Sequence, residues 1–347
     1  MKNNEVRKDY LLNRWVIIAK ERKKRPVDFV KKKLMEKQSV CPFCPDNEHM
    51  TPPAVLTYLV SDRELKKVKD RNHFYHKNWT VRVVPNAYPA FSPPDEETLL
   101  TETGVLKNAV GHHEVIIESP CHDEHPGAAR VSQLVHVINA YLDRLTAISR
   151  NSYVKHITIF RNHGREAGAS LSHTHSQLIA TPLIPRILEE ELAASKSFWT
   201  QNNKCLLCDV LEEENDGPRF IWENSSFVVF APWASVNPFE FWVLPKRHQS
   251  KMLDMSGREV QDLAEVMRVC LGALRFILND PPYNFGFHTL LTDDSEDCYH
   301  WHLEVYPRLT IWAGFEKSTG MFINTVSPED AAKELEKAAQ AEQNFLR

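Results

Sequence analysis

Several features that would assign a chain to a common class of protein are missing from these 347 residues. No uncharged stretch approaches eighteen apolar residues, and the first residues lead directly into charged ones, so neither a membrane-spanning helix nor a secretory signal is predicted. The net charge of −4 provides no overall attraction to nucleic acid or to an anionic membrane. We therefore expect a cytoplasmic protein that binds neither of them.

The cysteines also lack the even number that is typical of a disulfide-stapled protein. There are seven, and four of them form two C-x-x-C pairs, Cys41/Cys44 and Cys205/Cys208. In a cytosolic chain such pairs favour metal or redox chemistry over disulfides. The spacing of a zinc finger is absent, because the histidines are far away in the sequence. Any metal would therefore staple loops to strands of a larger fold.

The apolar residues, 42% of the chain, are sufficient for a large core, and their pattern predicts two similar sets of elements. In the first set, strands are expected at 79–84, 114–118 and 154–160, with a helix at 131–148. In the second set, strands are expected at 227–230, 239–244 and 283–291, with a helix at 260–278. A strand at 10–18 and a proline-containing connection over 45–70 are also expected.

Each set is followed by an H-x-H segment, and the spacings of the histidines match. His122 and His173 are 51 residues apart, and His248 and His300 are 52 apart. The C-x-x-C pairs precede them at unequal distances, but extra residues in surface loops cost little free energy. We infer an internal duplication with two domains, at residues 1–195 and 196–347.

Each half then offers two thiolates and two imidazoles, which are the ligands that Zn²⁺ prefers. The first expected metal set is Cys41, Cys44, His122 and His173. The second is Cys205, Cys208, His248 and His300. His288 and His302 are alternative ligands in the second half. Two zinc ions per chain are expected, because the two pairs lie in matching frames.

The segment Ser170–Gln177 (SLSHTHSQ) contains the candidate for chemistry. Alternate side chains of a strand share a face, so His173, His175 and Gln177 point the same way. If His173 binds metal, His175 is left free to attack a phosphorus atom, while the preceding glycine-containing loop and the Gln177 amide hold phosphoryl oxygens. In the second half Glu304 replaces the glutamine and an acidic run precedes the motif. Only the first half is expected to be catalytic.

The run FRNHGREAGASLSHTHSQ resembles the active-site segment of the galactose-1-phosphate uridylyltransferase family, a branch of the histidine triad superfamily. The resemblance continues through NRWVII, CPFC, VPNAYPA, ESPCH, CLLC, PKRH, HWHLEVYP and GFEKSTGMFIN. It implies an α+β fold of two fused histidine-triad-like domains, each an antiparallel sheet with flanking helices. It also implies a homodimer.

The resemblance further implies a ping-pong reaction on a nucleotide sugar. His175 would attack the α-phosphate and release the sugar 1-phosphate, while Gln177 steadies the phosphoryl group. Arg22 and Arg25 would meet phosphate, Asn86 the nucleoside, Asn162, Gly168 and Ser170 the phosphates, and Phe315 and Glu316 the sugar. Where a third histidine replaces the glutamine, enzymes of the superfamily hydrolyse, so Gln177 favours transfer.

Four features depart from the best-studied uridylyltransferases. Thr174 replaces a proline, Ala87 replaces an aspartate, residues 318–322 lack a glutamine, and a second C-x-x-C is present. These features recur in a subgroup that includes the plant ADP-glucose phosphorylases. The first hypothesis is a UDP-glucose:hexose-1-phosphate (galactose-1-phosphate) uridylyltransferase, and the alternative is an ADP-glucose phosphorylase that transfers adenylyl to phosphate. A non-catalytic zinc-stapled nucleotide-binding module and a dinucleoside polyphosphate hydrolase or phosphorylase are further hypotheses.

Overall fold

The computed structural model describes residues 4–20, 40–61, 64–71, 74–94, 109–292 and 295–346. Arg22 and Arg25, which the resemblance places near phosphate, lie outside these residues. Among the helices described, none is both long enough and apolar enough to cross a lipid bilayer.

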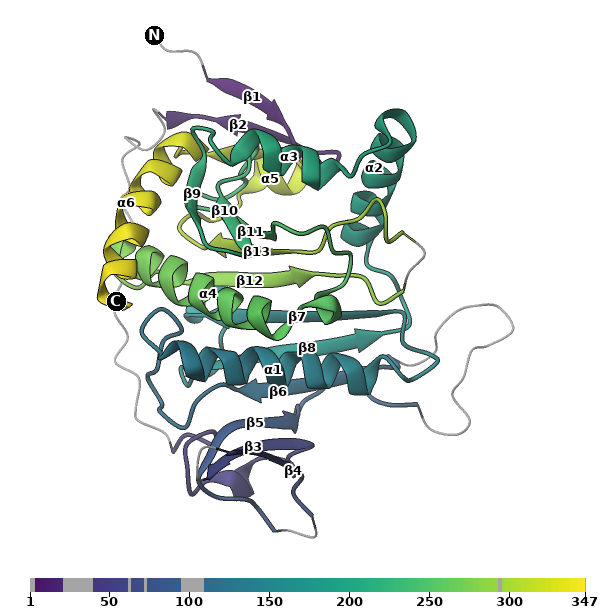
Figure 1. Cartoon of the computed structure of the whole chain (residues 1–347), viewed down its shortest axis with the longest axis vertical. Coiled ribbons are helices and arrows are strands. Elements are labelled where there is room, and N and C mark those ends of the chain that lie inside the picture. The colour runs from purple at the N-terminus through teal and green to yellow at the C-terminus, as the bar shows by residue number, and fades with distance from the viewer. Residues whose placement is uncertain are drawn as a thin grey trace.

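One antiparallel sheet runs through the centre of the molecule (Figure 1). Its strands from the first half are β3 (Leu56–Ser61), β4 (Glu64–Val68), β5 (Trp79–Pro85), β6 (His112–Ile117), β7 (His156–His163) and β8 (His175–Thr181). Those from the second half are β9 (Phe220–Glu223), β10 (Phe227–Phe230), β11 (Phe241–Pro245), β12 (Tyr283–His288) and β13 (His302–Pro307). The order is β4-β3-β5-β6-β8-β7-β12-β13-β11-β10-β9, so the halves meet where β7 pairs with β12.

The order of the strands repeats once across this sheet. The run β5-β6-β8-β7 corresponds to β10-β11-β13-β12. Helix α1 (Val131–Ile148) lies between β6 and β7, and α4 (Gly257–Leu278) lies between β11 and β12. The two helices lie side by side on one face of the sheet (Figure 1). The expected α+β fold of two fused histidine-triad-like units is confirmed, and both units contribute to one continuous sheet.

Both helices form where their apolar periodicity predicts them. In α1, buried side chains recur every three or four residues and face the sheet. Helix α4 begins with a capping box. Ser256 Oγ accepts from the Glu259 N–H at 3.3 Å, and Glu259 Oε2 accepts from the Ser256 N–H at 2.7 Å. These local signals fix which faces of the helices turn toward the core.

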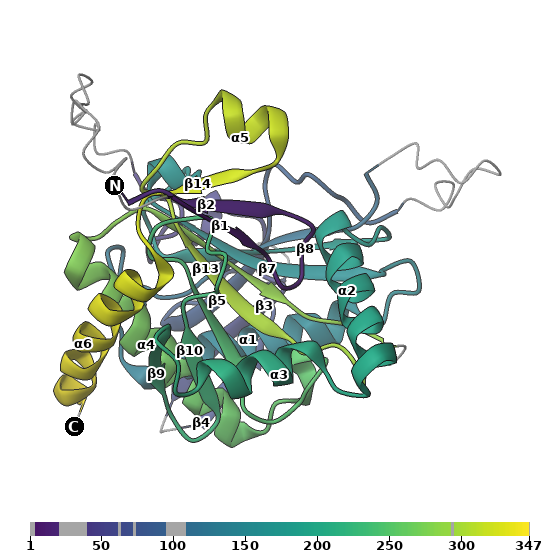
Figure 2. The ribbon, with the colours of Figure 1, turned by 90° about the horizontal axis from the view of Figure 1, so that it is seen from above.

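The opposite side of the molecule carries a smaller sheet and the short helix α5 (Figure 2). The remaining elements are β1 (Glu5–Lys8), β2 (Trp15–Ile18), β14 (Phe322–Asn324), α2 (Arg186–Asn202), α3 (Leu206–Glu214), α5 (Gly314–Thr319), α6 (Pro328–Leu346) and the 3-10 turns η2 (Glu48–Met50), η3 (Arg165–Ala167) and η4 (Met252–Asp254). The domain boundary predicted after residue 195 falls inside α2, and the division into domains stays a prediction.

Two of the expected elements were wrong in detail. The strand predicted at 10–18 is interrupted before β2, because the Asp9 carboxylate accepts the N–H groups of Leu11 and Leu12 and holds a turn. The connection predicted over 45–70 contains the hairpin β3-β4. Its inner strand buries Leu56, Thr57 and Tyr58 in succession, and so short a run does not distinguish a strand from a loop.

Candidate active site and metal centres

His175, the first residue of β8, lines a pocket of about 500 Å³. Its Nδ1 lies 2.7 Å from the carbonyl oxygen of His173. A carbonyl can only accept, so Nδ1 carries the ring proton and Nε2 of the neutral ring keeps its lone pair. Burial lowers the pKa of His175, which favours this neutral form. The result is a neutral imidazole with a fixed tautomer, which is what a nitrogen nucleophile requires.

The rest of this pocket combines apolar walls with a few polar groups. Its apolar lining includes Pro42, Phe43, Met50, Pro52, Val84, Val115 and Leu171. Asn86, Ser170 and Gln177 join His175 as its predicted polar members. Such a lining is typical of a site for a small organic ligand. The sequence indicated the polar groups, but the apolar wall comes from separate segments that no single motif joins.

Phe43 is a wall residue of particular interest, because it comes from the first C-x-x-C pair. Its ring centroid lies 5.4 Å from that of His175 and 6.0 Å from that of His173, with edge-to-face geometry in both cases. The cysteine loop is therefore packed directly against the candidate nucleophile.

The loop between β7 and β8 brings Asn162 and Gly168 together. Gly168 has a φ of 91°, in the left-handed region that favours glycine, and a Cβ there would lie 3.8 Å from Asn162 Nδ2. Asn162 Oδ1 accepts from Asn284 Nδ2 at 2.8 Å, so the amide nitrogen of Asn162 faces the loop as a donor. Ser170 lines the His175 pocket, whereas Asn162 and Gly168 lie outside its lining.

Strand β8 is anchored from its other face by a buried ion pair between Glu118 and Arg161. Thr174 Oγ1 donates to Glu118 Oε2 at 3.1 Å and accepts from Arg161 Nη2 at 3.1 Å. The hydroxyls of Ser176 and Tyr141 donate to Glu118 Oε1. Burial by itself raises the pKa of Glu118, but the Arg161 charge and these hydroxyls bring it below its ordinary value. Sequence reasoning missed this network, whose members have no spacing in common.

Phe315 and Glu316, expected to meet the sugar, do not line the His175 pocket. Both belong to α5, where the Phe315 ring is 43% exposed. Glu316 Oε2 accepts from the Ala313 N–H at 2.9 Å, within its own helix. Within one chain these two residues therefore do not share the pocket with His175 and Gln177.

The first predicted metal set comes together. Cys44 Sγ lies 3.3 Å from His122 Nδ1, and both thiols lie 3.6 Å from His173 Nδ1. Tetrahedral zinc, with sulfur at about 2.3 Å and nitrogen at about 2.0 Å, requires sulfur–nitrogen distances of about 3.5 Å. His173 Nε2 donates to the carbonyl of Ser119 at 2.8 Å, so the lone pair of its Nδ1 faces the thiols. The donor set fits zinc.

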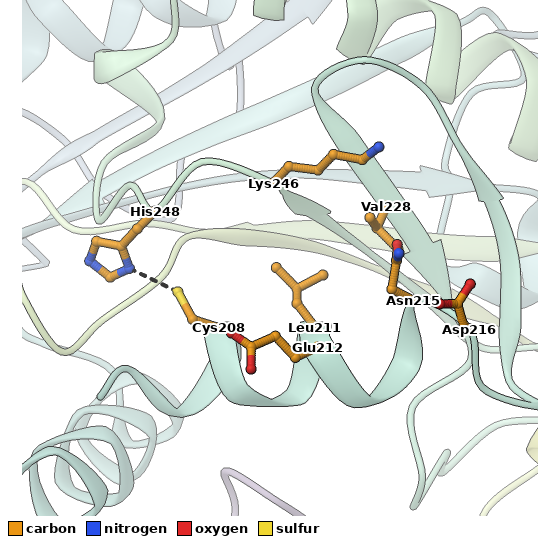
Figure 3. A pocket seen from close by; sticks show the side chains of 8 residues that line it. All are labelled: Cys208, Leu211, Glu212, Asn215, Asp216, Val228, Lys246 and His248. Carbon is orange, nitrogen blue, oxygen red and sulfur yellow. Dashed lines mark hydrogen bonds between the residues drawn. The ribbon is translucent and has the colours of Figure 1, made fainter. Parts of the chain in front are cut away.

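The second predicted set has the same arrangement. Cys208 Sγ lies 3.2 Å from His248 Nδ1 and 3.4 Å from His300 Nδ1, and Cys205 completes the group. Figure 3 shows Cys208, near the start of α3, facing His248. His248 Nε2 donates to the Glu296 carbonyl at 2.8 Å, which again leaves Nδ1 as the ligand atom.

A pocket of about 560 Å³ adjoins this second group (Figure 3). Two of its charged groups are already paired, because Lys246 lies 2.7 Å from Glu223 and Glu212 lies 2.7 Å from Lys204. Among its described lining residues there is no histidine with a free ring nitrogen outside the Cys/His group, and no set of hydrogen-bond donors like that around His175. The pocket at His175 is therefore the better candidate for the chemistry, although this pocket is slightly larger.

His288 and His302 do not join the second cysteine pair, so their role as alternative ligands there is not supported. They form a separate group with Glu191 and Glu304, which could hold a cation through nitrogen and oxygen. Burial lowers the pKa of His288, but the two carboxylates outweigh it and raise the value to about 9. Glu191 Oε1 lies 2.7 Å from His288 Nδ1, so a proton already links this pair.

A further group of potential ligands, His125, His163 and Asp280, fits a metal poorly. His125 Nδ1 accepts from the Gly127 N–H at 3.0 Å, so its Nε2 carries the proton and cannot bind a cation. Arg275 lies 3.6 Å from the Asp280 carboxylate and would repel one.

The second copy of the motif is closed to ligands. His302 Nδ1 contacts the His300 carbonyl as in the first copy, but its Nε2 lies 3.2 Å from Glu304 Oε1. Trp242 pairs with Glu304 at the sheet position where Val115 pairs with Gln177, and its ring stacks on His302 at 5.3 Å. His302 is fully buried. The duplicated histidine is thus shielded, in agreement with a single reactive copy.

Comparison with known proteins finds relatives along nearly the whole chain. Residues 1–185 match the family model of the galactose-1-phosphate uridyl transferase N-terminal domain, and residues 120–344 match a domain of unknown function, DUF4921. ADP-glucose phosphorylase from Arabidopsis thaliana is 37% identical over 95% of this chain and 91% of its own length. Galactose-1-phosphate uridylyltransferase from Thermotoga maritima is 28% identical, over 95% and 97%.

Solved structures give the same picture. The crystal structure of the Arabidopsis ADP-glucose phosphorylase with bound ADP-glucose has a TM-score of 0.83 and 34% identity, covering 97% of this chain and 99% of that one. A uridylyltransferase structure has a TM-score of 0.74 and 25% identity, covering 97% and 99%. With a family model over more than half of its length and relatives along nearly all of it, the chain belongs to the galactose-1-phosphate uridylyltransferase family of nucleotidyltransferases.

Proposed function

We propose that this enzyme transfers a nucleotidyl group through a covalent intermediate on His175. The observation that carries the proposal is the hydrogen bond from His175 Nδ1 to the His173 carbonyl, because it leaves Nε2 unprotonated in the pocket. Nε2 attacks the α-phosphorus of a nucleotide sugar, the phosphorus–nitrogen bond forms, and the bond to the bridging oxygen breaks. The sugar 1-phosphate leaves with that electron pair. An acceptor phosphate oxygen then attacks the same phosphorus and releases His175.

The surrounding residues stabilise the groups that react in each step. The His173 carbonyl accepts a hydrogen bond from Nδ1–H, which stabilises the positive charge that forms on the ring during attack. The Gln177 amide has no proton to lose near neutral pH, so it donates to a phosphoryl oxygen without acting as a general acid. The apolar walls around Phe43 suit a nucleoside base and limit access of water.

For the substrates we propose ADP-glucose as donor and inorganic phosphate as acceptor, with UDP-glucose and galactose 1-phosphate as the second candidate pair. The greater similarity to the Arabidopsis ADP-glucose phosphorylase supports the first pair. The family model and the Thermotoga uridylyltransferase support the second. Incubation with each nucleotide sugar, followed by intact mass measurement, separates them. An AMP adduct supports the first pair, a UMP adduct the second, and no adduct would favour a binding module.

We also propose that the two Cys/His groups each hold zinc and fix the loops around them. The matching thiol–imidazole distances in both groups support this. Freshly purified protein is expected to contain about two zinc equivalents per chain. Cys208→Ser should reduce the content to about one equivalent, and Cys298→Ser, which changes a buried cysteine outside both groups, should leave it unchanged. One equivalent or less in the wild-type protein would contradict the duplicated sites.

In a homodimer, helix α5 of one chain could contact the sugar bound to the other chain. Phe315 and Glu316 lie away from the pocket of their own chain, so we propose that α5 enters the site of a second chain. If so, co-expressed His175→Ala and Glu316→Ala chains should regain about a quarter of wild-type activity, because half of the dimers carry one intact site. Each variant alone should be much less active. If α5 serves only its own chain, co-expression will restore nothing.

A further inference from the structure

His113 lies on β6, diagonal to Gln177 on the neighbouring strand, and its ring joins two parts of the site. Its Nε2 lies 2.8 Å from Gln177 Oε1. Its Nδ1 lies 3.0 Å from the backbone nitrogen of Ala90, in the segment that follows Asn86. It does not line the pocket itself.

The contact with Ala90 fixes the tautomer of this imidazole. A backbone N–H can only donate, so Nδ1 must accept and carries no proton. The neutral ring therefore has its proton on Nε2, and this N–H donates to Gln177 Oε1. The assignment follows from one obligatory donor and does not depend on the placement of any side-chain hydrogen.

The tautomer in turn determines which end of the Gln177 amide is available. With its oxygen bound to His113, the amide presents its NH₂ group away from β6. If the Gln177 amide were rotated by 180°, its carbonyl oxygen would face the expected phosphoryl oxygen. Two hydrogen-bond acceptors would then face each other. We propose that His113 is a positioning residue, which holds the Gln177 amide with its donor end toward the phosphoryl group. This inference rests on the proposed nucleotidyl transfer.

The backbone of His113 also contacts Asn86, the residue expected to meet the nucleoside. The Asn86 N–H donates to the His113 carbonyl at 2.8 Å. Asn86 Nδ2 lies 3.1 Å from His113 Nε2, but both are donors, so this contact is no hydrogen bond. Flipping the Asn86 amide would break its bond from the Tyr88 N–H to Oδ1, at 2.9 Å. The Asn86 NH₂ group therefore has no acceptor on the His113 ring, and Asn86 lines the pocket beside Gln177.

A kinetic experiment tests the role with two variants. His113→Leu removes the donor, whereas His113→Gln can place an amide N–H near the position of Nε2. In single-turnover adduct formation, His113→Leu should be about tenfold slower with an affinity for the nucleotide sugar within about twofold of wild type. His113→Gln should recover most of the rate. Loss of affinity alone, or failure of His113→Gln to recover the rate, would overturn the role.

The same substitution in a Gln177→Ala variant tests whether His113 affects the rate through Gln177. If His113 acts through Gln177, His113→Leu should cause no further slowing in that background. An equal additional slowing would show a merely structural role and overturn the proposal.

A measurement without substrate keeps the inference separate from the proposed function. In ¹⁵N-histidine-labelled protein, the His113 ring, assigned by its loss in His113→Gln, should have the Nε2–H tautomer at neutral pH. An Nδ1–H tautomer would overturn the proposed orientation of Gln177. If the tautomer is found but no nucleotide sugar yields an adduct, the nucleotidyl transfer fails and the phosphoryl role of His113 is overturned with it.

Discussion

Replacement of His175 with alanine should abolish formation of the nucleotidyl adduct and reduce turnover by at least about a thousandfold. The equivalent histidine of the second half cannot take over, because His302 is fully buried, stacked on Trp242 and paired with Glu304. The metal content should remain that of the wild type, since His175 belongs to neither Cys/His group. Intact mass after incubation with ADP-glucose or UDP-glucose measures the adduct, and elemental analysis measures the metal.

The internal copy supplies the matched control. His302→Asn changes the same position of the motif in the second half and should still form the adduct, which peptide mapping should locate on His175. An adduct that survives in His175→Ala would disprove the assignment of the nucleophile. An adduct lost in His302→Asn, in protein that is folded and metal-loaded, would disprove the division between a reactive and a shielded copy.

The features of the site that sequence could predict are those with a chemical pattern. Paired cysteines, spaced histidines and the H-x-H-x-Q segment each restrict the chemistry. Comparison of the two halves also assigns different roles to His173 and His175 from the sequence alone. The structure brings together both Cys/His groups as expected. The long helices α1 and α4 were also predictable, because an apolar stripe over five turns is a strong signal.

Other features depend on tertiary contacts between residues with no common pattern. The pocket wall combines Met50, Val84 and Leu171, three apolar residues that would be equally at home in any core. The closure of the second copy depends on Trp242, which the sequence shows only as one more aromatic residue in a buried strand. The position of α5 away from His175 could not be inferred either, since a motif specifies a role and not the chain that provides it.

The departure from the family pattern at Thr174 has a physical explanation in the structure. A proline could neither donate to Glu118 nor accept from Arg161, as the Thr174 hydroxyl does. Ser176 adds a second hydroxyl to the same carboxylate. Alternate residues of one strand therefore divide into a face that carries the chemistry and a face that is bound to a buried ion pair. The orientation of His175 depends on both.

Arg161→Met should be the most destabilising substitution in this network, because it leaves the Glu118 carboxylate buried without its cation. Removing one partner of a buried pair costs about 3–5 kcal/mol of unfolding free energy. Chemical denaturation in the presence of zinc measures the loss. Adduct formation should slow as well, since Thr174 loses one of its two partners and strand β8 is less firmly held. Lys155→Met, an exposed substitution on the approach to β7, is the matched control and should cost less than about 0.5 kcal/mol.

The dependence of this loss on pH distinguishes the ion pair from simple packing. In the wild type the folded pKa of Glu118 lies below the unfolded value of about 4.3, so its stabilisation is present above that pH and is lost as pH falls through the folded pKa. Without Arg161, burial raises the folded pKa above the unfolded one, and stability then falls as pH rises between the two. The deficit of Arg161→Met should therefore grow from pH 4 toward neutrality. Adding Glu118→Gln removes the titrating group, so the double variant should be more stable than Arg161→Met at pH 8, and its deficit should be constant above about pH 5. A deficit in Arg161→Met that is equally large at both ends of this range would show that Arg161 contributes packing and that the charge of Glu118 is immaterial.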